Sequence, residues 1–229
     1  MSRPARRTAG LVCEGPSDFG LFEAVVRRLW PAVSRVLLLQ PQVDALTGHA
    51  QGSAGWTGVK AWCREYAGKL DLVIDPGIGP PLDLLVIALD ADIATEALAA
   101  EPRPASNSTH LPTRLRAQIQ AWLGAANNAV LPAAVVVSAP TMAVEAWVIA
   151  ALFPSQRAPE QLPSPAKFLV GNRLLAMDPR RPGKVKKPPE TYRRFAAALA
   201  DKLDHVRKRC PEAEQISKAI EQRRSLADH

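Results

Sequence analysis

Apolar runs alternate with segments of helical periodicity along the first two thirds of the chain. Four apolar runs have the aliphatic composition of buried strands; they lie at 8–13, 35–40, 82–92 and 133–139. Segments in which apolar side chains recur every three or four residues predict amphipathic helices; they lie at 18–30, 57–70, 111–124 and 142–153. This order of strands and helices predicts an α/β fold, with a mostly parallel sheet and helices on both of its faces.

The clearest predicted strand is LDLLVIALDAD, residues 82–92. Its apolar positions are continuous rather than alternating, which is typical of a central strand that helices cover on both faces. Segment 41–55 contains three glycines and predicts an exposed loop.

The pattern changes after residue 153. Residues 154–190 contain eight of the 21 prolines and show no clear periodicity, which predicts a long irregular connection. Helical periodicity returns at 189–209 and 212–226. We therefore predict an α/β core at 1–153, followed at 154–229 by a Pro-rich connection and a basic helical appendage that packs on the core.

The excess positive charge is confined to the C-terminal part of the chain. Residues 180–229 contain 14 Lys/Arg and 7 Asp/Glu, whereas residues 1–179 contain 15 of each sign. Such a region can attract a polyanion such as nucleic acid, although a solvated helical surface fits the charge equally well. The predicted nucleic-acid contacts are Lys184, Lys186, Lys187, Arg193 and Arg194.

Composition predicts a globular protein of the cytoplasm. The chain is 47% hydrophobic and 22% charged, and no apolar run reaches the about 18 residues that a membrane span needs. The basic N-terminus precedes no long apolar segment, so we expect neither export nor a membrane partner. The three cysteines are scattered, which argues against a disulfide framework or a zinc site.

Acidic residues follow two of the predicted strands. Glu14 ends strand 8–13, and Asp90 and Asp92 end strand 82–92. Ligands of open α/β sheets gather beyond the carboxyl ends of the strands, and the D-x-D spacing on an extended segment would point both aspartates the same way. Clustered carboxylates repel one another unless a cation neutralises them, and oxygen-only clusters suit Mg²⁺ or Mn²⁺.

Two further acids are candidate ligands. Asp18, at the start of helix 18–30, would return a fourth oxygen to the cluster; alternatively, Glu14 and Asp18 merely cap that helix. Glu145 lies in the apolar helix 142–153, where a carboxylate needs compensation. A metal ion, the helix N-terminus and an arginine salt bridge are all plausible partners for it.

The segments VCEGPSD and LLVIALDADIA together resemble the paired signatures of TOPRIM domains. Glu14 matches the TOPRIM glutamate, and Asp90 and Asp92 match the acids of the DxD motif. Asp18 matches an acid of the OLD-type (overcoming lysogenization defect) nucleases. The segments PTMAVEAWVIA, KKPPETYRRF and RCPEAEQI are similar to a small stand-alone TOPRIM-like family that is often encoded beside ATPase genes.

The resemblance implies a TOPRIM-like fold and a Mg²⁺- or Mn²⁺-dependent nuclease acting on DNA or RNA. Glu14, Asp90 and Asp92 would hold one ion and carry catalysis, Asp18 and Glu145 would add ligands for a second, and Lys187 would supply a cation near the phosphate. The family also implies an ABC- or AAA-type ATPase partner and a phage-defence or toxin-like system.

Other members of the TOPRIM superfamily fit the chain less well. It has no GxxxxGK[ST] ATPase motif, no primase zinc cysteines and no domain around Tyr66 or Tyr192 that suits a topoisomerase. Hydrolysis remains the expected reaction. The alternatives are a non-catalytic TOPRIM-like module that binds an ATPase or nucleic acid, and a phosphatase or nucleotide hydrolase.

Overall fold

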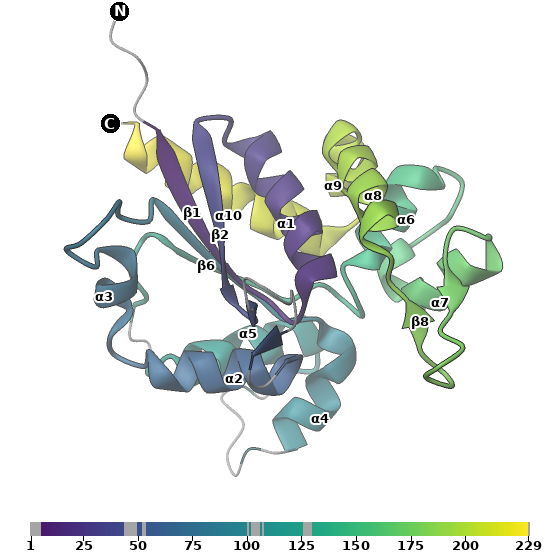
Figure 1. Cartoon of the computed structure of the whole chain (residues 1–229), viewed down its shortest axis with the longest axis horizontal. Coiled ribbons are helices and arrows are strands. Elements are labelled where there is room, and N and C mark those ends of the chain that lie inside the picture. The colour runs from purple at the N-terminus through teal and green to yellow at the C-terminus, as the bar shows by residue number, and fades with distance from the viewer. Residues whose placement is uncertain are drawn as a thin grey trace, which may run out of the picture.

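A parallel sheet lies at the centre of the protein (Figure 1). The structure is a computed structural model that describes residues 6–43, 50–51, 54–99, 101, 106, 108–125 and 130–228. Within these residues the sheet has four parallel strands in the order β2-β1-β5-β6. They are β1 (Arg7–Val12), β2 (Val33–Gln40), β5 (Leu84–Ala88) and β6 (Val135–Ser138). The predicted α/β class and parallel sheet are therefore confirmed.

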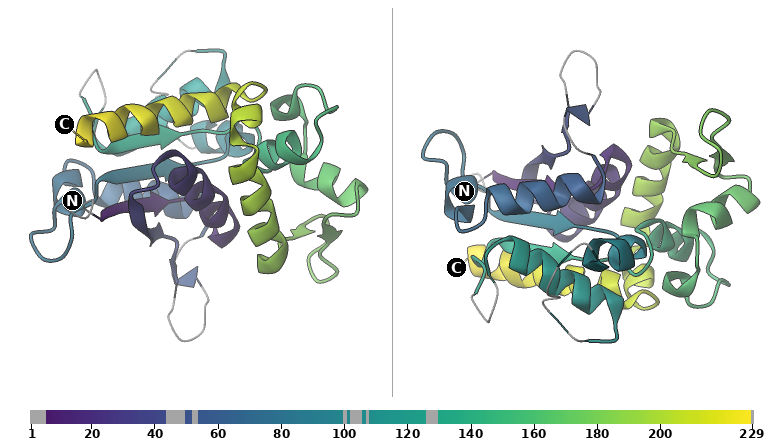
Figure 2. Two further views of the ribbon diagram at one scale, coloured as in Figure 1. Left: turned by 90° about the horizontal axis from the view of Figure 1, so that it is seen from above. Right: turned by 90° about the horizontal axis from the view of Figure 1, so that it is seen from below.

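Helices cover both faces of the sheet (Figure 2). Leu84 and Val86 of β5 belong to one hydrophobic cluster, with α1 (Pro16–Leu29) and α10 (Pro211–Ala227). Leu85 and Ile87 belong to another, with α2 (Trp56–Glu65) and α5 (Leu111–Trp122). Because successive strand residues point to opposite faces, burial on both sides explains why the apolar run of β5 is continuous.

Several predicted elements differ in their bounds. Helix α1 begins at Pro16 rather than at residue 18, since proline suits the first helical position. The predicted helix 57–70 is divided into α2 and α3 (Leu70–Ile74), and α4 (Ala94–Ala99) was not predicted. The predicted loop 41–55 contains an antiparallel pair, β3 (Gln42–Val43) and β4 (Ala50–Gln51); its residues 44–49 and 52–53 lie outside the described part.

The predicted irregular connection over 154–190 contains several short elements that the sequence analysis did not foresee. This segment contains a short 3-10 helix, η2 (Pro159–Gln161), helix α7 (Pro165–Gly171), and the antiparallel pair β7 (Ala176–Met177) and β8 (Val185–Lys186). Prolines begin both helical pieces, where their missing N–H has no helical partner to lose. The elements are too short to produce a periodic pattern in the sequence.

The C-terminal helices share the hydrophobic core of the sheet. Helices α8 (Pro189–Asp201) and α9 (Leu203–Arg207) pack against α6 (Glu145–Leu152), and α8 also packs along α1. A break at Lys202 divides the predicted helix 189–209 into α8 and α9. Phe22 of α1 meets Trp147 of α6 edge-on, with ring centroids 5.6 Å apart. Within the described residues, no helix combines the length and apolar character that crossing a bilayer requires.

Candidate metal centre

Glu14, Asp90 and Asp92 converge at the carboxyl edge of the sheet. Strands β1 and β5 are neighbours in register, with Val12 opposite Ile87. The chain leaves β1 toward β2 on one side and returns to β5 on the other, so this is the switch point where α/β sheets form ligand crevices. One carboxylate oxygen from each acid lies within 4.8 Å of the others. The predicted convergence of the three acids is confirmed.

A turn, rather than strand alternation, brings Asp92 to the other two acids. Asp90 is still extended, but Asp92 lies in a 3-10 helix, η1 (Ala91–Ile93), so the expected extended D-x-D was wrong. The N–H of Asp92 donates to the carbonyl of Met142 at 3.0 Å and holds this turn in place. Met142 has a φ of 69°, a strained value for a non-glycine residue of the kind that gathers at functional sites.

Backbone N–H groups hold the carboxylates of the centre. The N–H of Asp90 donates to Oε1 of Glu14 at 3.3 Å, and the N–H of Val144, just before α6, donates to Oδ1 of Asp90 at 3.2 Å. Gly55 precedes α2 and donates its N–H to the Glu14 carbonyl at 3.1 Å. Its φ of 70° favours glycine, and a Cβ there would lie 3.9 Å from Oε2 of Glu14.

The pKa of each of the three acids is raised above its ordinary value. Burial raises the pKa of Glu14 to about 8, and repulsion from Asp18 and Asp92 adds to the shift. Burial also raises the pKa of Asp90 well above its ordinary value, and the neighbouring acids contribute further. Asp92 is the most exposed of the three, and its pKa is raised by partial burial and then by Glu145. A bound cation would stabilise the ionised form of all three carboxylates, and oxygen ligands of this kind suit Mg²⁺ or Mn²⁺.

Asp18 and Glu145 lie in the same cavity but pair with a lysine. The Lys187 ammonium lies 2.8 Å from Oε1 of Glu145 and 3.8 Å from Oδ1 of Asp18. The Tyr192 hydroxyl donates to the same Glu145 oxygen at 2.5 Å. Although burial alone would raise the pKa of Glu145, Lys187 and Tyr192 bring it below the ordinary value. Burial raises the pKa of Asp18 to about 6 despite Lys187.

The five acids therefore form two chemically different sets. Within the described residues, Glu14, Asp90 and Asp92 make no ion pair with a lysine or arginine, whereas Glu145 already has a lysine and a tyrosine as partners. The partner of Glu145 is a lysine rather than the arginine considered from the sequence. The sequence analysis missed Tyr192; its place in the first turn of α8, five residues after Lys187, was the available indication.

Cations line the same cavity as the carboxylates, and its volume is about 550 Å³. Its basic wall, formed by α7 and the β7–β8 region, consists of Lys167, Arg181, Lys184 and Lys187. Lys184 and Lys187 were predicted as nucleic-acid contacts, whereas Lys167 and Arg181 were missed because their segment shows no clear periodicity in the sequence. The other predicted contacts do not line this cavity: Lys186 and Arg194 are exposed outside it, and Arg193 lines a groove on α8.

Comparisons with known proteins do not assign the chain to a family. A scan against protein-family models and searches of curated proteins and of solved structures found no match. The resemblance of the two acidic motifs to TOPRIM domains therefore stays a prediction, as does Lys187 as a catalytic cation.

Metal binding to the three acids will depend steeply on pH. Carboxylates must lose their protons to bind a metal ion, and the pKa of Glu14 is about 8 in the free protein. We expect the affinity for Mn²⁺ to rise about tenfold per pH unit for each proton displaced as the pH approaches about 8. Calorimetric titration in buffers of different ionisation enthalpy measures both the affinity and the number of protons released.

The pH dependence of the stability of the metal-free protein tests the same raised pKa values without a metal ion. A carboxyl whose pKa is raised by folding stabilises the folded state at low pH, and this contribution is lost as the pH rises through about 8. In EDTA these groups should therefore lower the melting temperature between about pH 5 and about pH 8. Excess Mg²⁺ should restore it at the upper end. A pH-independent affinity without proton release would contradict binding at these carboxyls.

Proposed function

We propose that this protein is a divalent-metal-dependent nuclease that hydrolyses phosphodiester bonds of DNA or RNA. Glu14, Asp90 and Asp92 hold Mg²⁺ or Mn²⁺ in this proposal. One observation carries it: three converging carboxylates and four cations line a single cavity. A phosphodiester carries negative charge. A metal ion held by the carboxylates would attract it, and the cations of the cavity would contact it directly.

The basic wall supports a polyanionic substrate. Lys167 and Lys184 line the cavity, and neither makes an ion pair with another residue in the described part of the chain. Arg181 pairs with Asp178, three residues earlier, at 2.7 Å. The two lysines can therefore contact phosphates beside the one that is cleaved, without reading the bases.

Within the centre, the chain supplies charge and position. A divalent ion there would polarise a phosphoryl oxygen and activate water. Glu145 and Asp18 hold the Lys187 ammonium at the edge of the centre, where it can stabilise negative charge that develops on the phosphate. Backbone N–H groups fix the carboxylates of Glu14 and Asp90 before substrate arrives.

The two acidic motifs support a finer assignment. We include in the proposal that the parallel sheet is TOPRIM-like, because a glutamate after the first strand and a DxD after β5 meet at one edge. The resemblance is also the basis for an ATPase partner and a role in phage defence. A non-catalytic module remains the alternative for experiment to exclude.

Purified protein should cleave DNA or RNA when Mg²⁺ or Mn²⁺ is added and should lose this activity in excess EDTA. Gel electrophoresis of labelled oligonucleotides and plasmid DNA measures cleavage. Higher salt should weaken substrate binding, because the basic wall displaces counterions from the phosphates. Inactivity toward every nucleic acid in both metals would contradict the proposal and favour the non-catalytic module.

A double variant distinguishes a nuclease from a phosphatase. Lys167→Gln combined with Lys184→Gln should raise the KM for an oligonucleotide and reduce the slope of log affinity against log salt by up to about 2. Hydrolysis of a small phosphomonoester, if any, should change little. Efficient monoester hydrolysis that exceeds cleavage of the polymer would instead favour the phosphatase.

A further inference from the structure

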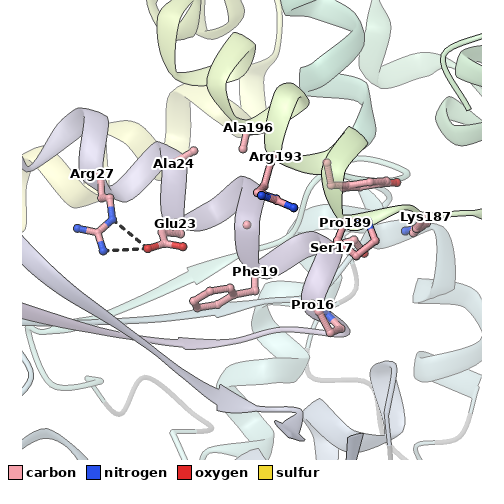
Figure 3. Close-up of a pocket in the computed structure, with 12 residues that line it drawn as sticks. Pro16, Ser17, Phe19, Glu23, Ala24, Arg27, Lys187, Pro189, Arg193 and Ala196 are labelled. Carbon is pink, nitrogen blue, oxygen red and sulfur yellow. Dashed lines mark hydrogen bonds and ion pairs between the residues drawn. The ribbon is translucent and has the colours of Figure 1, made fainter. Parts of the chain in front are cut away.

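An apolar groove lies beside the metal centre, between α1 and α8 (Figure 3). Its volume is about 680 Å³. One face of α1 and one face of α8 form its walls, because the lining residues recur every three or four positions on each helix. The α1 side includes Phe19 and Ala24, and the α8 side includes Pro189 and Ala196.

Small residues keep the groove open. Gly20 lies inside α1, where glycine destabilises a helix relative to alanine. A Cβ at Gly20 would meet no atom within 4 Å, so close packing does not explain this glycine. The groove passes over Gly20. Further along it is lined by Ala24 and Ala196, whose side chains are too small to fill it.

The groove and the metal cavity share part of their walls. Ser17 and Lys187 line both of them. Figure 3 shows these two residues at one end of the groove and Arg27 toward the other end. Pro16 and Ser17 begin α1 only two and three residues after the metal candidate Glu14. A ligand whose charged part lies at the metal centre can therefore extend an apolar part into the groove.

The charges of the groove are largely balanced within the protein. Arg27 pairs with Glu23 at 2.9 Å, and Arg193 pairs with Glu190 at 2.6 Å. Lys187 is held by Glu145. These pairs make the groove a poor site for a phosphate, whereas Lys167 and Lys184 of the metal cavity make no ion pair within the described residues. The apolar walls and the Phe19 ring suit a flat aromatic group instead.

We propose that this groove binds an unpaired nucleobase of the substrate, next to the phosphate at the metal centre. The proposal rests on the nuclease function proposed above and adds the class of substrate to it. Bases inside a duplex are stacked and paired, so a base can enter the groove only from a single strand or after leaving the duplex. The preferred substrate is therefore single-stranded DNA or RNA, or an unpaired region of a duplex.

Filling the groove tests the proposal. Gly20→Phe places a ring in the open space, and Gly171→Phe in α7 is a matched control, because a Cβ at Gly171 also meets nothing within 4 Å. The probe is an oligonucleotide that carries 2-aminopurine, in single-stranded and duplex forms. Binding is followed by fluorescence in EDTA, where cleavage is blocked, and kinetics are measured with Mg²⁺. Thermal melting and Mn²⁺ titration show that each variant is folded and retains its metal centre.

The wild-type protein should cleave the single strand at least about tenfold more efficiently than the duplex, and its binding should change the 2-aminopurine fluorescence. Gly20→Phe should raise the KM for the single strand about tenfold and abolish the fluorescence change, whereas Gly171→Phe should behave like wild type. Unchanged kinetics in Gly20→Phe, or equal cleavage of the duplex, would overturn the base site and leave the nuclease function standing.

Two other outcomes separate the proposals. A fluorescence change that Gly20→Phe abolishes, without cleavage in any metal, would support the base site and remove the nuclease function. A Gly20→Phe protein that binds the probe normally but dissociates from a dimer to a monomer in sedimentation would overturn the base site. The groove would then hold a second copy of the chain.

Discussion

Replacing Asp90 by asparagine should lower metal-dependent cleavage by at least about 10³-fold in kcat/KM, about 4 kcal/mol of transition-state stabilisation. Asparagine has nearly the same shape, and its carbonyl oxygen can still accept the N–H of Val144 that Oδ1 of Asp90 accepts now. The substitution therefore removes charge from the centre while keeping its geometry. The affinity for Mn²⁺ should fall in parallel, which titration calorimetry measures independently of cleavage.

The stability of Asp90→Asn adds a second test. Asp90 is half-buried beside other carboxyls, and its raised pKa means that its ionised form destabilises the metal-free protein. In EDTA at about pH 8 the variant should melt no lower than wild type, and Mg²⁺ should no longer raise its melting temperature. Asp71→Asn, on the exposed surface of α3, is the matched control. Cleavage by Asp90→Asn at the wild-type rate would disprove a catalytic role for the centre.

The sequence predicted the acidic centre well because strand ends are strong markers. The apolar runs before Glu14 and Asp90 placed both residues at the exits of strands, and parallel strands bring their carboxyl ends to one edge. Asp92 was assigned to the right place for the wrong reason, since a 3-10 turn directs it rather than strand alternation. A turn of three residues is too short to produce a recognisable pattern of hydrophobic positions.

The cations of the cavity and the partners of its acids were harder to predict. Lys167 and Arg181 come from a Pro-rich segment whose helix and strands are too short for a repeating pattern. Tyr192 was overlooked because its contact with Glu145 joins residues 47 positions apart, which no local pattern encodes. The groove over Gly20 depends on how α1 and α8 pack, and that also requires the tertiary structure.

Replacing Lys187 by methionine should destabilise the protein by about 2–3 kcal/mol and lower its melting temperature by roughly 4–12 °C. The change leaves Glu145, which is 1% exposed, without a cation. The expected loss lies below that of a fully buried pair, because the Lys187 side chain is 38% exposed and Tyr192 still donates to Glu145. Lys186→Met changes the neighbouring exposed lysine and should alter stability by no more than about 0.5 kcal/mol.

The loss in Lys187→Met should depend on pH in a defined direction. Lys187 and Tyr192 lower the pKa of Glu145, so their stabilisation is present above the ordinary pKa of a glutamate and disappears as the pH falls through the lowered value. Without the lysine this pKa rises, and Glu145 takes up a proton in mildly acidic solution. The difference in melting temperature from wild type should therefore be largest near neutral pH and shrink toward about pH 4.

A second substitution separates the structural and catalytic effects of Lys187. Glu145→Gln combined with Lys187→Met removes both charges, so stability should return to within about 1 kcal/mol of wild type. Cleavage should stay about 10²-fold below wild type, because the cation near the phosphate is still missing. Recovery of both stability and cleavage would show that Lys187 serves only to neutralise Glu145. Lost cleavage in a stable double variant would instead show that the charged pair of Glu145 and Lys187 takes part in the reaction.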